Sequence, residues 1–280
     1  MTQQVAIQGI QGAFHEIAAR TYFGNTVSCT YCDSFKEVFQ SVQSNTCEYG
    51  IVAIENTVAG SLLQNYHLLK ESKAKIIGEV SLHITQNLMV LPGTSIDDIT
   101  EVYSHPIAIA QSKDFFEHKP SVKLIEWSDT ASSAKKIAHE KLPHAAAIAS
   151  TYAAELYGLE IIAPEIETHK KNYTRFLVIS RQCEKNNQNN KTSLCFETGH
   201  QPGALADVLQ IFKHNSINLT KIQSLPILGH PYLYAFYADI EWKERSNYDK
   251  VLTEVLQVVS NLSVLGEYKR DEQFNHEILN

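Results

Sequence analysis

Short apolar runs alternate with segments of helical periodicity as far as Ser180. Val5–Ile7, Ile51–Ile54 and Ala145–Ala149 have the length and character of buried strands. A turn and a helical pattern follow each run: Phe14–Tyr22 after Gly9 and Gly12, Leu62–Lys70, and Tyr152–Tyr157 with Ser150 as N-cap and Gly158 as C-cap. Ile76–Leu91, Leu124–Glu126 and Phe176–Ser180 are predicted to supply further strands. This alternation predicts an α/β fold with sheets rich in parallel strands.

The C-terminal part has a different order of elements. Strand patterns occur at Ser193–Glu197, Ile217–Gln223, Tyr232–Glu241 and Leu262–Tyr268, and helical patterns at Ala204–His214 and Tyr248–Val259. The order β-α-β-β-α-β predicts a separate ferredoxin-like domain.

An Asn-rich polar run, Cys183–Asn190, separates the two parts and reads as an exposed linker. We therefore expect a large domain over 1–182, a linker over 183–190, a small domain over 191–270 and a tail over 271–280.

Charge and composition exclude several classes of protein. The 280 residues include 24 Lys plus Arg and 31 Asp plus Glu, a formal charge of −7 at pH 7. A general nucleic-acid binder needs clustered cations and is disfavoured. No apolar run approaches the roughly 20 residues of a membrane span, and Met1–Ile10 lacks the features of a secretory signal. We expect a cytoplasmic protein with neither nucleic-acid nor membrane partners.

The sequence also predicts no cofactor. Gly9-x-x-Gly12 is not the dinucleotide fingerprint, no phosphate-binding P-loop occurs, and the twelve histidines form no metal-binding spacing. Cys29 and Cys32 form a C-x-x-C pair within the strand pattern Val27–Asp33. Reduced thiols on a strand are favoured there, and redox or zinc chemistry stays open as the alternative.

Candidate chemistry lies in the turns between strands and helices. The turns Gly9–Phe14, Glu55–Ser61 and Ser150–Thr151 each precede a predicted helix, whose free N–H groups can bind an anion. Ordinary helix caps are an equally good interpretation. Asn172–Phe176 is more specific, because Thr174 could relay a hydroxyl proton and Arg175 could bind a carboxylate with two hydrogen bonds. The alternative there is a surface turn.

At these residues the chain resembles a known family, the prephenate dehydratases that carry a C-terminal ACT domain. The resemblance runs from about Val5 to Tyr268. It is carried by Gly50–Ser61 with its Ile-Glu-Asn-Thr run, Ser104–Gln111 with Ser-His-Pro, Ala146–Ile162, the Thr-Arg-Phe of Asn172–Phe176, and in the ACT region Gln201–Leu205 and Ser216–Ile222.

The resemblance implies a reaction and a set of site residues. Prephenate would lose carbon dioxide and its ring hydroxyl to give phenylpyruvate, a step in L-phenylalanine biosynthesis that needs no cofactor. Thr174 would protonate the leaving hydroxyl, Arg175 would hold a carboxylate or stabilise the loop, and Phe176 would pack beneath. The implied substrate-binding residues are Glu55, Asn56, Thr57, Ser61, Ser104 and Gln111.

The resemblance also implies architecture and regulation. The catalytic part would be a two-lobed fold like periplasmic binding proteins, with one lobe over 1–79 and 162–182 and the other over 80–161. A homodimer or homotetramer would bind L-phenylalanine at its ACT domains and be inhibited by it. The implied phenylalanine-site residues are Gly203, Ala204, Leu205, Ala206, Asn218, Leu219, Gln223 and Ser224.

Two departures from the family pattern affect these expectations. Ala13 stands where the family's first turn has a Thr hydroxyl, and Gln223-Ser-Leu-Pro226 replaces the family's Glu-Ser-Arg-Pro. Three alternatives stay open: an arogenate dehydratase, a non-catalytic amino-acid sensor, and an ACT domain that only dimerises.

Overall fold

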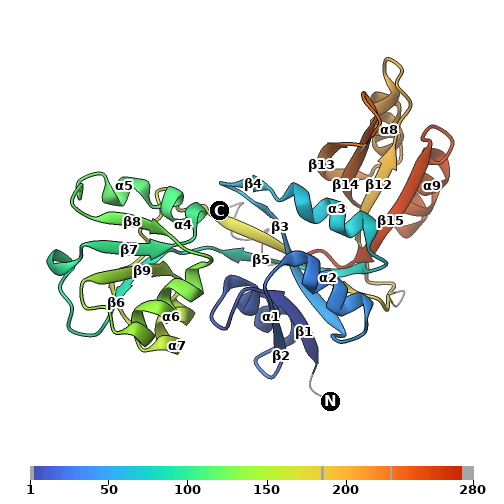
Figure 1. The fold of residues 1–280 in the computed structure, drawn as a ribbon. Coiled ribbons are helices and arrows are strands. Elements are labelled where there is room, and N and C mark those ends of the chain that lie inside the picture. The colour runs from blue at the N-terminus through green and yellow to red at the C-terminus, as the bar shows by residue number, and fades with distance from the viewer. Residues whose placement is uncertain (1–2, 184–185, 228, 273–280) are drawn as a thin grey trace. The chain divides into compact units, whose positions relative to one another are not determined.

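The computed structural model describes residues 3–183, 186–227 and 229–272, whose strands form three sheets (Figure 1). The chain divides into two compact units, Met1–Leu62 with Val80–Phe176 and Leu63–Glu79 with Leu177–Asn280. The predicted linker at 183–190 and tail at 271–280 include residues outside the described ranges, and the domain boundaries stay predictions. Within those ranges no helix has the length and apolar character needed to cross a membrane.

The first sheet has the order β2-β1-β3-β11-β5, with β4 paired to β3, and β1 is parallel to both of its neighbours. Helices α1 (Phe14–Phe23) and α2 (Phe35–Gln43) contact β1 and β3, and α3 (Leu63–Glu71) follows β4. The strands are β1 (Gln4–Gln8), β2 (Ser28–Cys32), β3 (Tyr49–Asn56), β4 (Gly60–Ser61), β5 (Lys75–His83) and β11 (Tyr173–Ser180).

The second sheet has the order β10-β6-β9-β7-β8, in which β7 is parallel to β8 and β9 whereas β6 is antiparallel to β9 and β10. Its strands are β6 (Asn87–Val90), β7 (Glu101–Ser104), β8 (Lys123–Glu126), β9 (Ala145–Ala149) and β10 (Glu160–Ala163). The helices are η1 (Ile96–Asp98), α4 (Pro106–Gln111), α5 (Lys113–Phe116), α6 (Thr130–Glu140) and α7 (Thr151–Tyr157).

Strand β9 is uniformly apolar because both of its faces are covered. Ala146 and Ile148 pack with Phe116 of α5 on one face, while Ala147 packs with Ile137 of α6 on the other. Alternate side chains of a strand point to opposite faces, so a doubly covered strand needs an unbroken apolar run. The sequence prediction for this strand, with its Ser150 and Gly158 helix caps, is confirmed. The predicted strand Ile76–Leu91 is in fact two strands, β5 and β6, which belong to different sheets.

The third sheet confirms the predicted β-α-β-β-α-β order. Its strands β12 (Lys191–Glu197), β13 (Asn218–Pro226), β14 (Tyr234–Glu241) and β15 (Asn261–Tyr268) lie in the antiparallel order β13-β14-β12-β15. Helix α8 (Ala204–His214) matches its prediction. Helix α9 (Arg245–Val255) begins three residues before the predicted start and ends before Val259, so that prediction was shifted.

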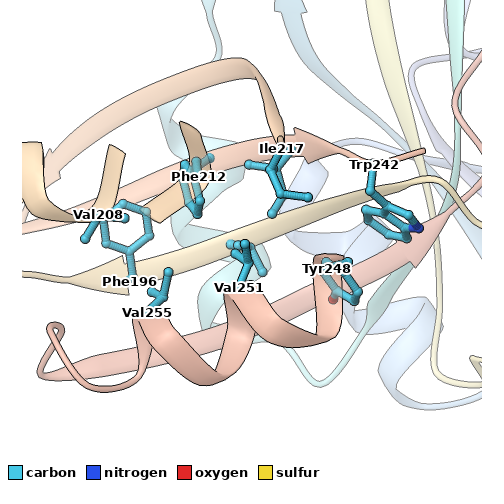
Figure 2. Packing of buried hydrophobic residues seen from close by; sticks show 11 residues of the cluster. Phe196, Val208, Phe212, Ile217, Trp242, Tyr248, Val251 and Val255 are labelled. Carbon is cyan, nitrogen blue, oxygen red and sulfur yellow. The ribbon is translucent and has the colours of Figure 1, made fainter. Parts of the chain in front are cut away.

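Helices α8 and α9 cover one face of the third sheet (Figure 2). Val208 and Phe212 of α8, and Val251 and Val255 of α9, are spaced four residues apart and therefore point the same way, into the core. Trp242 and Tyr248 stack at the end of this core with ring centroids 4.1 Å apart. Apolar residues at this spacing are what made both helices visible in the sequence.

The opposite face of the third sheet is covered by α3 and the start of β5. Tyr66 packs against Tyr237 with ring centroids 5.0 Å apart, and buried Lys191 pairs with Glu79 over 2.9 Å. These contacts explain why residues 63–79 group with the C-terminal part of the chain.

Candidate active site

A cavity of about 230 Å³ lies in the first compact unit and is lined from both of its sheets. Gln8 and Asn56 line it where β1 and β3 end, and His105 and Asp129 line it just after β7 and β8. The carboxyl ends of parallel strands are the usual ligand site of α/β folds. Of the sequence-predicted residues, Asn56, Gln111, Thr174 and Phe176 line the cavity, whereas Glu55, Thr57, Ser61, Ser104 and Arg175 do not.

Four polar side chains in and beneath the cavity wall form one hydrogen-bond network. Asn56 Nδ2 donates to Asn172 Oδ1 over 2.7 Å and to Thr174 Oγ1 over 2.9 Å. Asn172 Nδ2 donates to Gln111 Oε1 over 3.0 Å, and Asn56 Oδ1 accepts from the backbone amides of Val58 and Ala59. The network fixes which way each amide faces. Since Asn56 donates to Thr174, the hydroxyl proton of Thr174 is free to point elsewhere.

Strand alternation separates Arg175 from the cavity. Thr174 and Phe176 line the cavity, and Arg175 between them pairs with Glu55 over 3.1 Å. Successive side chains of a strand point to opposite faces, so these three residues cannot share one wall. The ion pair of Arg175 and Glu55 therefore links the start of β11 to the end of β3.

The other predicted polar residues make structural contacts. Thr57 Oγ1 donates to the Lys171 carbonyl and accepts from the Tyr173 amide, both over 2.9 Å. Ser104 is fully buried and donates to the Ile148 carbonyl over 2.7 Å. Ser61 lies opposite Glu55 in the β3–β4 pair. These contacts stabilise the walls on which Asn56 and Thr174 lie.

Sequence reasoning gave no role to several residues of this site, although Asn172 lies within a segment that it singled out. Asn172 lies two positions before Thr174, and that spacing on a strand could have indicated a shared face. His15 in the first turn of α1 packs between Phe35 and Phe176, with ring centroids 5.3 and 5.0 Å away. A lone histidine in a helical pattern gives no such signal, because its neighbours come from distant segments.

The cavity has little formal positive charge. Of the described residues, no lysine or arginine lines it, and Asp129 contributes a carboxylate. Burial lowers the pKa of His15 to about 4 and also lowers the pKa of His105, so neither imidazole is a permanent cation at neutral pH. The first residues of α1, α2 and α6 line the cavity, and their helix dipoles supply partial positive charge.

The Gly9–Phe14 turn accepts hydrogen bonds from both ends of α7, its N-cap Ser150 and its last residue Tyr157. Ser150 Oγ donates to the Gly12 carbonyl over 3.3 Å and Tyr157 donates to the Gln11 carbonyl over 2.6 Å. Gly12 has φ +95°, and a Cβ there would lie 3.3 Å from Leu156. Of the predicted anion-binding turns, Ser150–Thr151 is thus a helix cap that contacts another turn.

A second cavity, of about 440 Å³, lies in the C-terminal unit at the start of α8. The predicted residues Gly203, Ala204, Leu205 and Ala206 line it together with Tyr232, Tyr234 and Phe236. The predicted Asn218, Leu219, Gln223 and Ser224 do not line it and lie on β13, an edge strand of the third sheet.

The C-x-x-C pair lies on strand β2. Residues three apart on a strand point to opposite faces, which keeps the two sulfur atoms of Cys29 and Cys32 apart. Both thiols are free, and burial raises the pKa of Cys29 to about 11. These features agree with the interpretation as reduced thiols.

Comparisons with known proteins agree with the motifs and the fold. A family model described as prephenate dehydratase matches residues 5–184. A bifunctional chorismate mutase/prephenate dehydratase of Aquifex aeolicus is 36% identical, with 95% of this chain and 74% of the relative covered. Arogenate dehydratase/prephenate dehydratase 2 of Arabidopsis thaliana is also 36% identical, with 96% and 73% covered.

Solved structures share this fold over nearly the whole chain. A prephenate dehydratase from Arthrobacter aurescens in complex with L-Phe has a TM-score of 0.85 at 26% identity, with 95% of this chain and 90% of that chain covered. GqqA, described as a quorum quenching acylase, has a TM-score of 0.85 at 26% identity, with 97% and 100% covered.

Proposed function

Because the chain belongs to the prephenate dehydratase family, we propose that it converts prephenate to phenylpyruvate in L-phenylalanine biosynthesis. The bond from the ring to its carboxylate breaks and releases carbon dioxide. The electron pair aromatises the ring, and the ring C–O bond breaks with its pair on oxygen. One proton then turns the leaving hydroxide into water. Aromatisation drives the step, so the protein positions the substrate and assists the departure of hydroxide.

The hydrogen bond from Asn56 to Thr174 is the observation that carries this proposal. With its oxygen lone pair engaged by Asn56 Nδ2 over 2.9 Å, Thr174 is oriented as a donor into the cavity. A hydroxyl of ordinary acidity is a poor source of a full proton. Thr174 therefore acts as a strong hydrogen-bond donor to the departing oxygen, or as a relay. Phe176 packs beneath the substrate, and Gln111 joins the amide network from the other sheet's side.

The substrate's two carboxylates face partial positive charge from the first turns of α1 and α6. Arg175 stabilises the wall by pairing with Glu55 and does not bind a carboxylate of the substrate.

Arogenate dehydratase is the second candidate function. Arogenate carries an ammonium group where prephenate carries a ketone, and the Asp129 carboxylate on the cavity wall would favour that cation. The Arabidopsis relative bears both activities in its name. An acylase has less support, since amide hydrolysis needs a nucleophile activated by a base, whereas Thr174 accepts its hydrogen bond from an amide donor.

The C-terminal unit is an ACT domain that binds L-phenylalanine and mediates feedback inhibition. The start of α8 has a glycine N-cap with no side-chain cap, which leaves backbone N–H groups for a carboxylate. Tyr232, Tyr234 and Phe236 supply aromatic surface for the ligand's ring. The L-Phe complex of the Arthrobacter enzyme supports this assignment. The protein assembles as a homodimer or homotetramer and works in the cytoplasm.

The test is an absorbance assay for phenylpyruvate with purified protein and prephenate, run beside arogenate. Turnover of prephenate is the expected result, and Thr174→Val should lower kcat by about 10²–10⁴. Thr253→Val is the matched control, since Thr253 is exposed on α9 and does not line the cavity. If neither substrate is consumed while the protein binds L-phenylalanine, the protein is an amino-acid sensor and the proposal is wrong.

A further inference from the structure

None of the described residues that line the cavity is a permanent cation, although under the proposed function the ligand is a dianion. The described lining residues include no lysine or arginine, and Arg175, which lies between the lining residues Thr174 and Phe176, is paired with Glu55. Helix dipoles contribute only partial charges at each terminus. A group that becomes cationic when the substrate arrives would supply the missing charge.

His15 meets the requirements for such a group. Its imidazole lines the cavity between the rings of Phe35 and Phe176, and its Nε2 is shielded from solvent without a hydrogen-bond partner. In the empty cavity it is neutral, since burial lowers its pKa to about 4. Its place in the first turn of α1 also disfavours the cation, because the positive end of the helix dipole lies there.

The charged groups around His15 do not neutralise an imidazolium in advance. On its own helix Glu16 is bound by Gly12, Arg20 and Tyr152; on α2 Glu37 is bound by Ser34 and the Asp33 amide; on β11 Arg175 is paired with Glu55. Asp129 and His105 line the same cavity. Asp129 accepts from the Ser132 amide over 2.7 Å as the cap of α6.

His105, the other histidine that lines this cavity, is less suited to the role. His105 caps α4, and its Nδ1 already accepts a hydrogen bond from the Ile107 amide over 3.2 Å. Its pKa also responds to Asp129 and Glu126. For His15 the lowered pKa is due to burial, so a ligand carboxylate placed beside the ring would raise it.

We infer that His15 takes up a proton when the carboxylate-bearing ligand enters the cavity, and that the resulting imidazolium pairs with one ligand carboxylate. This inference rests on the proposed function for the identity of the ligand. The proton comes from solvent, and no bond in the ligand is made or broken in this step. Ligand affinity should therefore fall as pH rises between the low pKa of the empty site and the raised pKa of the occupied site.

Isothermal titration calorimetry with phenylpyruvate, the product anion, tests proton uptake directly. Titrations at pH 7 in two buffers of different ionisation enthalpy should show about one proton taken up per ligand by the wild type. His15→Gln keeps a polar side chain that cannot titrate and should show almost none. His105→Gln is the matched control and should keep the uptake. Unchanged uptake in His15→Gln, or none in the wild type, overturns the inference.

Kinetics with prephenate separate this inference from the proposed function. Between the pKa values of His15 in the empty and the occupied site, wild-type KM should rise by up to about tenfold per pH unit. The KM of His15→Gln should be higher and nearly independent of pH. Equal pH dependence in both proteins, with wild-type turnover intact, overturns the role of His15 and leaves the proposed function standing. Circular dichroism checks folding of the variant, and His15→Asn repeats the test with a shorter amide if His15→Gln is unfolded.

Discussion

Asn56 donates a hydrogen bond to Thr174 Oγ1 over 2.9 Å from a position 118 residues away in the sequence. Asn56 ends β3 and Thr174 lies at the start of β11, and these strands are neighbours in the first sheet. The pairing of two distant strands thus determines the direction in which a single hydroxyl proton can point.

Asn56→Asp should therefore damage turnover more than binding. The carboxylate still accepts from the Val58 and Ala59 amides but has no hydrogens to give, so Thr174 would donate to it instead of to the substrate. We expect kcat to fall by about 10²–10³. Steady-state measurement of kcat and KM for prephenate checks this.

Gln8→Glu is the control for added charge in the same experiment. Gln8 lines the cavity, so the variant adds a carboxylate to the lining without removing a donor from Thr174. KM should rise because the new charge repels the dianion, while kcat should stay within about threefold of the wild type. A kcat in Asn56→Asp as high as that of Gln8→Glu would contradict the role given to Asn56.

The buried carboxylate of Glu16 should be important for stability. It accepts from the Gly12 amide over 2.8 Å, from Arg20 over 2.6 Å and from Tyr152 over 3.2 Å. Glu16→Gln removes the charge and leaves a partly buried Arg20 without its charged partner, although Arg20 still donates to the Asn25 carbonyl. We expect the free energy of unfolding to fall by about 2–3 kcal/mol, discounted because Arg20 is partly exposed. Urea unfolding at pH 7 measures it.

Glu140→Gln is the matched control for this loss. Glu140 pairs with Lys136 over 2.7 Å at the same helical spacing, but its side chain is 52% exposed. Exposed pairs contribute little, so the change should stay below about 0.5 kcal/mol. Equal effects of the two variants would show that burial of Glu16 adds nothing.

Much of the fold could be predicted because its signals are local. The unbroken apolar run of β9, the caps Ser150 and Gly158, and the spacing within α8 each follow from neighbouring residues. Helices α2 and α6 were missed although their signals were present. Phe35, Val38, Phe39 and Val42 have helical spacing, and Asp129 with Ser132 forms a capping box.

The site was only partly predictable because its geometry is not local. Family motifs indicated Thr174, Asn56 and Gln111, and all three line the cavity. The same motifs placed Arg175 with them, and only the alternation of β11 shows that its side chain faces Glu55. His15 could not be predicted, because its ring packs against Phe35 of α2 and Phe176 of β11, which are distant from it in the sequence.

Alkylation of the cysteines should follow their burial. Burial raises the pKa of Cys29 to about 11, so at pH 8 its thiolate fraction is about a hundredfold lower than that of an ordinary thiol. Iodoacetamide at pH 8 should first modify Cys183, which is exposed, and the rate at Cys29 should rise with pH until the pH reaches about 11. Mass spectrometry of peptides follows each site. In urea all five cysteines should react; equal folded-state rates at Cys29 and Cys183 would contradict the prediction.

Gly203→Ala should weaken binding of L-phenylalanine. Gly203 has φ +88° as the N-cap of α8, a conformation that costs other residues about 1–3 kcal/mol, and no atom lies within 4 Å of its added Cβ. The substitution would thus act by reshaping the turn that presents the first N–H groups of α8. We expect at least about tenfold weaker binding in equilibrium dialysis with labelled ligand.

Gly24→Ala supplies the control for backbone strain alone. Gly24 ends α1 with φ +87°, also with open space around its added Cβ, and does not line the second cavity. Its substitution should leave the affinity for L-phenylalanine unchanged while costing similar stability. Equal affinities in both variants would remove the start of α8 from the binding site. A wild-type protein that binds no L-phenylalanine would instead support an ACT domain that only dimerises.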